Sequence, residues 1–389
     1  MKVDVCVVGA GPAGTSTALH LIREGLSVAL LDRATFPRDK CCGDGLTSLA
    51  LRELRRLDAL PDHLSSWRTI ERAEVVSPSG RRLGLDLRRQ PPIAATARRM
   101  EFDSFLLERA EQAGAMVRTG SGISDIRVDD SSVRITSDDA RVVVARHVVG
   151  ADGARSTLRR LLTQNTEHRN QRHDLLAMRA YGTEQADVRS DVLRVWFPPD
   201  LIPGYVWSFP SGKREINFGI MVNRRHFGKT GQLRAVWDKL SAGSSAIPID
   251  QVQNPKSWPI PSTLRLNRLS DSGALFVGDA AGLADPMTGE GIGQALVSGR
   301  YAAESIARSK PGQREGAAAE YRRRISRVLV AEHELSASLV RPLSHARLLD
   351  KGLQAVGVVP GAKSFFARWM FEDVRRTSAA LPCRWTAAA

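Results

Sequence analysis

The chain has 389 residues, of which 42% are hydrophobic and 25% charged, and its formal net charge is +14. This length is too great for one simple core, so we expect two or three domains. No apolar run approaches the ~20 residues of a membrane-spanning helix, and the scattered arginines lack the interleaved aromatic residues of a nucleic-acid site. We therefore expect a cytoplasmic protein that binds no nucleic acid. The four cysteines show neither a disulfide framework nor metal-ligand spacing, so no metal site is expected.

The beginning of the chain predicts a strand, a helix and a second strand. Residues 2–8 are short, β-branched and bounded by glycine, as in a buried strand. Residues 12–25 predict a helix that closes at Gly25. Residues 27–32 predict a second buried strand that ends at Asp32. This order is a βαβ unit of about 30 residues.

A glycine motif, Gly9-x-Gly11-x-x-Gly14, lies between the first strand and the helix. The first glycine permits a tight turn, the second lets the backbone approach a pyrophosphate, and the third lets helix and strand pack closely. The N-terminus of the helix then offers N–H groups and positive potential to phosphates. Asp32, 18 positions after Gly14, can accept hydrogen bonds from a ribose. The motif predicts a dinucleotide site without deciding between NAD and FAD.

The pattern of predicted helices and strands changes in the middle of the chain. Residues 46–57 and 100–113 predict amphipathic helices, and residues 68–94 and 115–150 predict strands. From about residue 172 to 264, short strands with aromatic residues, proline and glycine indicate an antiparallel sheet.

After residue 264 the sequence again predicts a buried strand, a glycine-containing turn and a helix, and from residue 312 it is mostly helical. We predict an α/β (α+β) protein in which a Rossmann-like nucleotide domain, built from discontinuous segments, receives an inserted antiparallel-sheet substrate domain. The expected ranges are 1–67, 95–171 and 265–311 for the nucleotide domain, 68–94 and 172–264 for the sheet domain, and 312–389 for a helical C-terminal part.

Two further motifs follow predicted buried strands. Residues 150–159, GADGARSTLR, place Asp152 at a strand end. Residues 276–293, FVGDAAGLADPMTGEGIG, place Asp279 after another strand, where it can hold a ribose-like polyol. Backbone amides of residues 289–293 can face the electron-rich edge of a flavin.

Together the three motifs resemble those of the FAD-dependent oxidoreductases with the p-hydroxybenzoate hydroxylase fold, over roughly residues 1–310. The resemblance implies a resident FAD, and of the adjacent Arg98 and Arg99 it assigns the FAD contact to Arg99. No second glycine motif for NAD(P)H is present, so either NAD(P)H docks transiently or a partner reductase supplies electrons. The implied FAD-binding residues are Gly9, Gly11, Ala13, Gly14, Asp32, Arg33, Cys42, Arg99, Asp152, Gly153, Gly278, Asp279, Pro286, Gly289, Gly291 and Ile292.

Two stretches narrow the resemblance to the geranylgeranyl reductase branch, which includes menaquinone-chain reductases. Residues 36–47, FPRDKCCGDGLT, are similar to its K-x-C-G-(G/D)-G loop. Cys42 takes the position of the branch cysteine because it directly precedes Gly43, and Cys41 is an extra residue. Residues 203–210, PGYVWSFP, resemble its P-x-x-Y-x-W-x-F-P motif, with the first proline one position late.

On a strand, Tyr205, Trp207 and Phe209 point to one face. They predict an aromatic wall for an alkyl or polyene chain, although such a stripe also occurs in the core of a sheet. The expected substrate pocket comprises Gly43, Asp44, Trp207 and Phe209.

Reduction of an alkene needs a hydride from reduced flavin and a proton from a nearby group. Cys42 and Tyr205 are the candidate proton donors, and a thiol titrates nearer to neutral pH than a phenol. The alternative for Cys42 is a small residue that only packs in a tight loop. We predict an FAD-dependent oxidoreductase that reduces a carbon–carbon double bond in a hydrophobic isoprenoid or polycyclic substrate.

Other activities stay open at this point. An FAD-dependent monooxygenase needs only the same FAD site, a dry pocket and oxygen access. A non-catalytic flavoprotein that only relays electrons would need no aromatic wall for a substrate. Flavin halogenases carry a catalytic lysine in the early substrate region, whereas here no lysine stands between Lys40 and Lys213.

Residues 346–371 are apolar with interspersed Arg and Lys. They predict either a helical pair packed on the core, or a basic amphipathic lip that touches a membrane peripherally and admits a lipid-like substrate. Pro360 and Gly361 predict a break between two helical segments.

Overall fold

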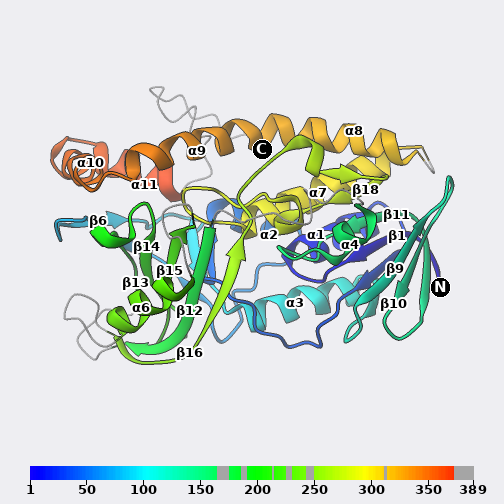
Figure 1. The fold of residues 1–389 in the computed structure, drawn as a ribbon, viewed down its shortest axis with the longest axis horizontal. Helices are drawn as coiled ribbons and strands as arrows, with labels where there is room; N and C mark the ends of the chain where they lie inside the picture. The colour runs from blue at the N-terminus through cyan, green and yellow to red at the C-terminus, as the bar shows by residue number, and fades with distance from the viewer. Residues whose placement is uncertain are drawn as a thin grey trace.

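The computed structural model describes residues 1–163, 175–184, 191–212, 214–224, 230–241, 249–310 and 313–371. Two large sheets lie side by side, and a long helical segment runs along one side of both (Figure 1). One sheet is mainly parallel and the other mainly antiparallel, and helices follow at the C-terminal end. The predicted mixed α/β class is confirmed.

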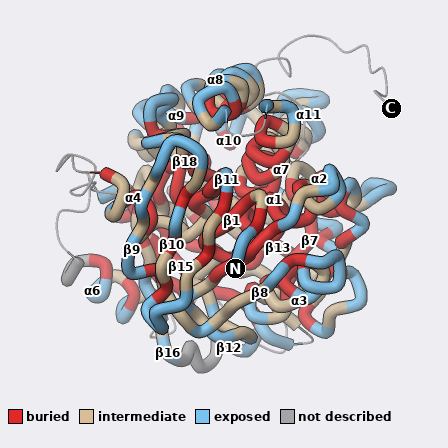
Figure 2. Tube along the Cα trace, turned by 90° about the vertical axis from the view of Figure 1, so that its right-hand side faces the viewer, coloured by how far each residue is buried: buried red, intermediate tan, exposed pale blue. Residues whose placement is uncertain are grey.

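The parallel sheet carries the N-terminal βαβ unit. Its strands are β17 (Ser270–Asp271), β18 (Ala274–Phe276), β11 (Val142–Gly150), β1 (Lys2–Val8), β2 (Val28–Leu31) and β8 (Met116–Arg118), with β10 (Val133–Ser137) and β9 (Ile123–Val128) continuing from β11. Helices α1 (Pro12–Arg23), α3 (Arg99–Gln112), α4 (Thr157–Leu162) and α7 (Ile292–Arg308) belong to this half of the molecule. Figure 2 shows α1 and α7 among its most buried elements.

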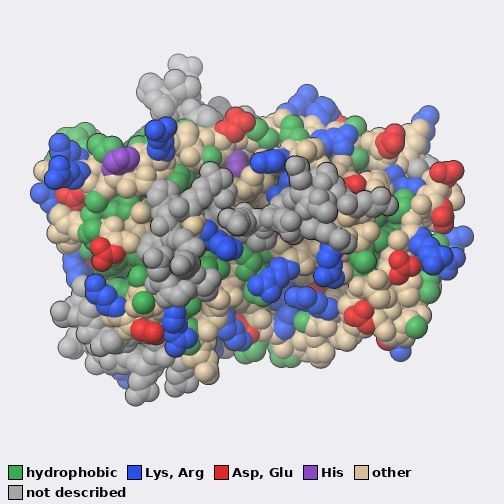
Figure 3. Space-filling view, in the orientation of Figure 1, with side chains coloured by type: hydrophobic (Ala, Val, Ile, Leu, Met, Phe, Trp, Pro, Cys, Tyr) green, Lys and Arg blue, Asp and Glu red, His purple; other side chains and the backbone are tan. Residues whose placement is uncertain are grey.

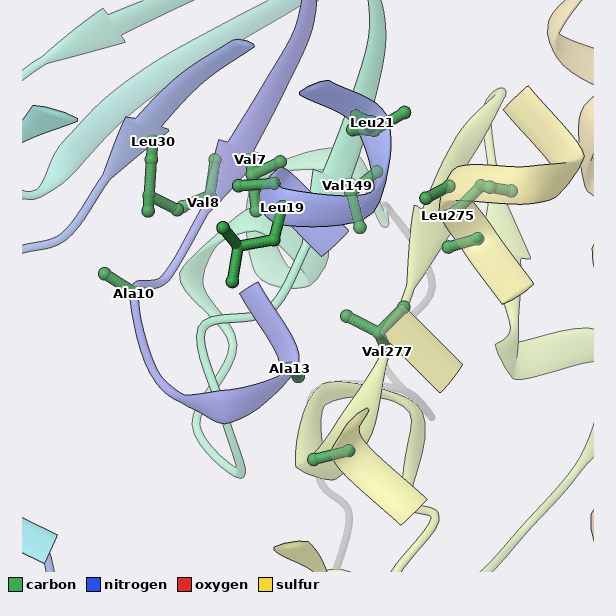
Figure 4. Close-up of a cluster of buried hydrophobic side chains, with 14 of the residues drawn as sticks. Val7, Val8, Ala10, Ala13, Leu19, Leu21, Leu30, Val149, Leu275 and Val277 are labelled. Carbon is green, nitrogen blue, oxygen red and sulfur yellow. The ribbon is translucent and has the colours of Figure 1, made fainter. Parts of the chain in front are cut away.

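Small residues let α1, β1 and α7 approach one another. A Cβ on Gly14 would lie 1.8 Å from the carbonyl oxygen of Gly9, and a Cβ on Gly299 would lie 2.6 Å from that of Ala13. Around this contact, valine and leucine side chains of β1, α1, β2 and β11 form one apolar cluster (Figure 4). The glycines therefore set the spacing between helices and sheet in the core.

The second sheet forms the other half of the molecule. Its strands are, in spatial order, β16 (Ile249–Ile260), β12 (Leu175–Glu184), β15 (Glu215–Asn223), β14 (Tyr205–Pro210), β13 (Val192–Trp196), β5 (Arg72–Val76) and β6 (Arg82–Asp86). All neighbours pair antiparallel except β13 and β5. Val206 of β14 and Phe218 of β15 belong to a core with Trp237 of α6 (Thr230–Ser241), so α6 covers one face of this sheet.

A short sheet of three strands lies at the start of the second helix. Strand β3 (Gly45–Thr47) pairs with β7 (Ala94–Thr96), which also pairs with β4 (Arg68–Thr69). The helix predicted over residues 46–57 therefore begins two residues later, as α2 (Ser48–Arg56). Pairing with β7 holds the backbone of residues 45–47 extended.

The C-terminal helices bridge the two halves. Helix α8 (Arg314–Ile325), a π-helical turn (Ser326–Val330) and α9 (Ala331–Leu343) follow one another without a break, and α10 (Ala346–Val358) and α11 (Ala362–Phe371) turn back at one end (Figure 1). Leu349 and Leu353 of α10 pack with Leu83 and Leu85 of β6. The break predicted at Pro360 and Gly361 falls between α10 and α11. Residues 372–389 of the expected helical part lie outside the described residues.

Charged side chains are distributed as the sequence predicted. Lys and Arg are spread over the face in Figure 3 from one end to the other. Within the described part of the chain, no helix combines the length and apolar content needed to cross a bilayer.

A buried carboxylate fastens α2 to α7. Glu53 of α2 is fully buried, and its oxygens lie 2.7 Å from Nε of Arg300 and 3.0 Å from a terminal nitrogen of Arg56. Arg300 also pairs with Glu304 at 3.1 Å. Removing one member of this buried ion pair would leave the other charge poorly compensated, so breaking the pair should lower the stability of the fold.

We expect Glu53→Gln to lower the free energy of unfolding by about 3 kcal/mol, because the Arg300 guanidinium loses its nearest carboxylate. Urea unfolding with excess FAD measures this. Asp58→Asn is the matched control. It breaks the Arg23–Asp58 pair, whose side chains are 44% and 81% exposed, and it should cost less than about 1 kcal/mol. Equal effects of the two variants would contradict the prediction.

Candidate functional site

A cavity of about 1230 Å³ runs from the glycine turn after β1 to helices α10 and α11. This volume exceeds the roughly 300–1,000 Å³ of a pocket for a drug-sized ligand. Asp32, Arg33 and Arg38 line the end near the parallel sheet, whereas Leu353 and Phe366 line the other end. The cavity can therefore hold a polar dinucleotide together with a second, apolar molecule.

The turn after β1 shapes the polar end. Gly9 has φ +105°, and a Cβ there would lie 2.3 Å from the carbonyl oxygen of Ala151. The carboxylate of Asp32 accepts hydrogen bonds from the backbone N–H groups of Ala10, at 2.7 Å, and Ala34, at 2.8 Å. These bonds fix the Asp32 carboxylate in the cavity wall, where a ribose hydroxyl can reach it.

Two arginines stand beside Gly11. The fully buried carboxylate of Asp103 binds Arg99 through two hydrogen bonds, at 2.7 and 2.8 Å, and Arg38 at 3.0 Å. Their terminal nitrogens lie 3.4 Å (Arg38) and 3.9 Å (Arg99) from the point where a Cβ on Gly11 would stand. Burial alone would lower the pKa of Arg99, but the Asp103 carboxylate outweighs it and raises the pKa. Both cations are thus placed to bind a pyrophosphate.

Asp152 and Asp279 both line the cavity, and they follow β11 and β18 by two and three residues. Oδ2 of Asp152 accepts a hydrogen bond from the backbone N–H of Leu158 at 2.9 Å, while its buried Oδ1 has no hydrogen-bond partner among the described residues. Burial raises the pKa of Asp152. Oδ2 of Asp279 lies 3.9 Å from Nζ of Lys40. An unsatisfied acceptor beside the glycine turn fits a ligand that supplies a donor.

Most of the predicted FAD-binding residues line this cavity, and a few do not. Those in its wall are Gly9, Gly11, Ala13, Asp32, Arg33, Cys42, Arg99, Asp152, Gly153, Asp279, Gly289, Gly291 and Ile292. Gly14 and Gly278 lie behind the wall, where they set backbone spacing, and Pro286 lies against Met287 outside it. Arg38 and Lys40 also line the cavity. The sequence analysis assigned them no role, although the basic cluster in FPRDK was the available signal.

The two adjacent cysteines have different surroundings. The thiol of Cys41 donates to the backbone carbonyl of Lys256 at 3.2 Å, and burial raises the pKa of Cys41 to about 11. The sulfur of Cys42 accepts a hydrogen bond from the backbone N–H of Asp44 at 3.4 Å, and it is one of the groups that raise the pKa of Arg99. Cys42 therefore lies next to the Arg99 cation, whereas Cys41 is bonded to β16.

Asp44 does not stand where the sequence analysis placed it. It was assigned to the substrate pocket, but its side chain is fully buried behind the loop and does not line the cavity. Its Oδ2 accepts hydrogen bonds from the Tyr181 hydroxyl and the Asn217 amide, both at 2.7 Å. These two donors hold the carboxylate against the second sheet and away from the cavity.

The aromatic residues of β14 form one wall of the cavity. The ring centroids of Tyr205 and Trp207 are 6.0 Å apart, and those of Trp207 and Phe209 are 6.2 Å apart. All three side chains line the cavity, as does Gly43 opposite them, while the intervening Val206 packs toward α6. The two-residue period of the strand therefore separates a wall facing the cavity from a core facing the helix.

The hydroxyl of Tyr205 is already engaged. It donates to the backbone carbonyl of Thr288, and burial raises the pKa of Tyr205. Trp207 donates from Nε1 to Oδ1 of Asn217 at 2.9 Å. Of the two candidate proton donors, Cys42 thus has the less committed proton.

These residues fit FAD. The glycine turn, the two arginines and Asp32 suit its ADP half, and Asp279 with the turn from Gly289 to Ile292 suits the ribityl chain and flavin. The structural observations that fit such a ligand are the unsatisfied Oδ1 of Asp152 and the two guanidinium groups that share the single carboxylate of Asp103 beside Gly11.

Comparisons with known proteins agree with this fit. A family model described as an FAD binding domain matches residues 2–331. The menaquinone reductase of Mycolicibacterium smegmatis is 30% identical over 400 residues, which cover 92% of this chain and 88% of that protein. The geranylgeranyl diphosphate reductase of Rhodobacter capsulatus is 31% identical over 318 residues, which cover 78% of this chain and 75% of that protein.

A solved structure shares the fold. It is the geranylgeranyl bacteriochlorophyll reductase-like protein of Thermoplasma acidophilum, with a TM-score of 0.82 and 23% identity. The match covers 95% of this chain and 96% of that one. The parallel sheet, the antiparallel sheet and the C-terminal helices therefore recur together in a second protein.

We expect purified protein to release FAD on denaturation, and Gly14→Val to abolish FAD binding. The valine side chain would push α1 away from β1, because a Cβ at this position already lies 1.8 Å from the carbonyl oxygen of Gly9. The absorption spectrum of the protein and chromatography of the released flavin measure this. Gly316→Ala in α8, whose Cβ would meet side-chain atoms no closer than 3.7 Å, is the control and should keep its FAD. FAD retained by Gly14→Val would contradict the prediction.

Proposed function

We propose that this chain, which belongs to the FAD-binding-domain family and to its branch of menaquinone and geranylgeranyl reductases, reduces a carbon–carbon double bond in a hydrophobic, isoprenoid-type substrate. The chain is an FAD-dependent oxidoreductase. The observation that carries the proposal is the continuity of the cavity: its polar part, which fits FAD, opens directly into an apolar part beside Cys42 and the aromatic wall. The names of the two relatives support the class of substrate.

The apolar part of the cavity suits a hydrocarbon chain. Beyond Phe209 it is lined by Val75 and Leu193 of the second sheet and by Leu353, Phe366 and Trp369 of α10 and α11. Transfer of apolar surface from water into such a lining contributes about 25 cal/mol per Å². A long polyene chain therefore gains most of its binding free energy here, and its double bonds can lie along the wall.

The residues at the junction must deliver a proton. Bound, reduced FAD supplies a hydride to one carbon of the double bond, and the other carbon needs a proton from the protein. Cys42 can donate that proton from its thiol, because the Asp44 N–H and the Arg99 guanidinium stand next to the sulfur and would stabilise it afterwards. A proton from solvent water then restores the thiol.

The balanced reaction adds two hydrogens to the substrate, so we expect the product mass to rise by that of two hydrogens. The test uses FAD-loaded protein, dithionite under nitrogen, and menaquinone or geranylgeranyl diphosphate as substrates. A gain of one oxygen, with rapid substrate-gated NADPH oxidation and oxygen uptake, would instead establish the monooxygenase alternative. Stopped-flow bleaching of the flavin distinguishes NAD(P)H, docking transiently, from a partner reductase as the electron donor.

We expect Cys42→Ala to lower kcat by about 10²-fold, the lower end of what a positioned general acid contributes, with normal FAD content. Cys41→Ala should change kcat little, because the Cys41 thiol is bonded to the carbonyl of Lys256. Steady-state kinetics with reductant present throughout measure both variants. If Cys41→Ala is the damaging change, the assignment of the two thiols is wrong. If neither variant is impaired, the thiol only packs in the loop.

We also infer that this cytoplasmic enzyme touches a membrane peripherally through α10 and α11. Four large apolar side chains there are exposed: Leu348 (54%), Val358 (72%), Val359 (52%) and Phe365 (47%). Exposed cations at positions 347, 351 and 363 surround them. Figure 3 shows hydrophobic side chains among Lys and Arg at this end of the molecule. Leu348 also lines the cavity, together with Leu349 and Leu353 of α10, so this contact would place the apolar cavity end next to lipid.

A double variant, Val358→Glu with Phe365→Glu, should reduce binding to vesicles of anionic phosphatidylglycerol by about tenfold, because two charges would enter the apolar contact. Flotation of the FAD-loaded protein with the vesicles measures it. Leu266→Glu is the control, because Leu266 is 41% exposed but lies in the parallel-sheet half, and it should bind as the unchanged protein does. Equal flotation of the two variants would refute the contact.

A further inference from the structure

The segment that carries the cysteines is held by a residue of the other sheet. Arg179 of β12 has a side chain only 2% exposed. Its Nε donates to the carbonyl oxygen of Cys42 at 3.2 Å, and one terminal nitrogen donates to Oδ1 of Asp39 at 2.7 Å and to the carbonyl oxygen of Lys40 at 2.9 Å. One guanidinium thus binds three groups of the segment from residue 39 to 42: the Asp39 carboxylate and the carbonyl oxygens of Lys40 and Cys42.

A second residue converges on the same carbonyl. Nδ2 of Asn217, a fully buried residue of β15, donates to the carbonyl oxygen of Cys42 and to Oδ2 of Asp44, both at 2.7 Å. Its Oδ1 accepts the hydrogen bond from Nε1 of Trp207 at 2.9 Å. Both ends of the Asn217 amide are therefore committed, and its orientation is fixed.

The carbonyl group of Cys42 determines where the thiol points. Residues 39–42 form no helix or strand, so hydrogen bonds must fix their backbone. With the carbonyl held from β12 and β15, the Cys42 sulfur stays beside Arg99 in the cavity wall, and the preceding Cys41 thiol turns onto β16. A backbone free to rotate at this carbonyl would let the two thiols exchange surroundings.

We propose that Arg179 and Asn217 are positioning residues, which hold the Cys42 thiol at the junction of the cavity by donating two hydrogen bonds to the Cys42 carbonyl oxygen. The proposal rests on the proposed role of Cys42 as proton donor. It also links the substrate to the thiol, because Trp207 of the aromatic wall bonds the same amide that bonds the Cys42 carbonyl. A hydrocarbon substrate that contacts Trp207 is therefore linked to the loop through the Asn217 side chain.

Three conservative variants test the proposal. Arg179→Lys keeps a positive charge near Asp39 but loses the fork of donors that reaches two carbonyl groups. Asn217→Ser is too short to reach the Cys42 carbonyl. Tyr181→Phe is the matched control, because it removes a hydrogen bond to Asp44 from the same buried network but none from Cys42.

The first measurement needs no substrate. The FAD-loaded proteins are treated with iodoacetamide, and the rates of modification of Cys41 and Cys42 are read separately by fragment mass spectrometry of the peptide that contains both. We expect Arg179→Lys and Asn217→Ser each to change the ratio of the two rates by about fivefold or more, because the thiols are no longer held apart. Tyr181→Phe should leave the ratio within about twofold. Thermal melting and FAD content identify any variant that fails to fold, and the other variant then decides.

The second measurement uses turnover. Arg179→Lys and Asn217→Ser should lower kcat by about tenfold, part of what a general acid contributes, with KM nearly unchanged, because the apolar wall stays intact. An unchanged rate ratio in folded variants would overturn the proposal, as would an equal change in Tyr181→Phe. If the ratio changes but the unaltered protein reduces no alkene, then the positioning stands and the proposed function fails.

Discussion

The structure depends on the contact between three backbones that the glycine turn allows. Gly14 brings α1 against the carbonyl of Gly9, and Gly9 itself lies against the carbonyl of Ala151, at the end of β11. Side chains at either position would separate a helix from its strand or one strand end from the next. Because these backbones touch, the ends of β1, β2 and β11 meet at one edge of the sheet. Asp32 after β2 and Asp152 after β11 then share one cavity with the glycine turn after β1, as the Rossmann arrangement requires.

The second sheet acts on this cavity in two ways. The two-residue period of β14 places three aromatic rings on the cavity side and leaves Val206 for the core with α6. Polar residues on β12 and β15 hold the cysteine loop, although that loop belongs by sequence to the parallel-sheet half. Hydrogen bonds from Arg179 and Asn217 thus hold the carbonyl groups of Lys40 and Cys42 against the second sheet.

Sequence patterns predicted the elements whose signals are local. The βαβ unit, the strand after residue 204 and the helical C-terminal part all follow from periodicity or glycine placement within a few residues. Asp103 stands four residues after Arg99, but its pairing with Arg38 is long-range and carries no local signal. The same holds for Arg179 and Asn217, which lie more than 130 residues from the loop that they bind. Asp44 was misplaced for the same reason. Its neighbours in the chain line the pocket, but its hydrogen-bond donors come from β12 and β15 and draw it inward.

The same arrangement explains how one FAD site can serve different reactions. The residues that fit FAD fix where the flavin lies but not what arrives on its substrate side. In this chain that side is an apolar wall closed by α10 and α11, with one thiol beside a cation at the junction. A substrate without polar groups can bind against such a wall, and in the reaction proposed above its proton would come from the Cys42 thiol of the loop. In the reaction proposed above, the proton donor lies on a four-residue segment that is hydrogen-bonded to two strands of the other sheet, β12 and β15.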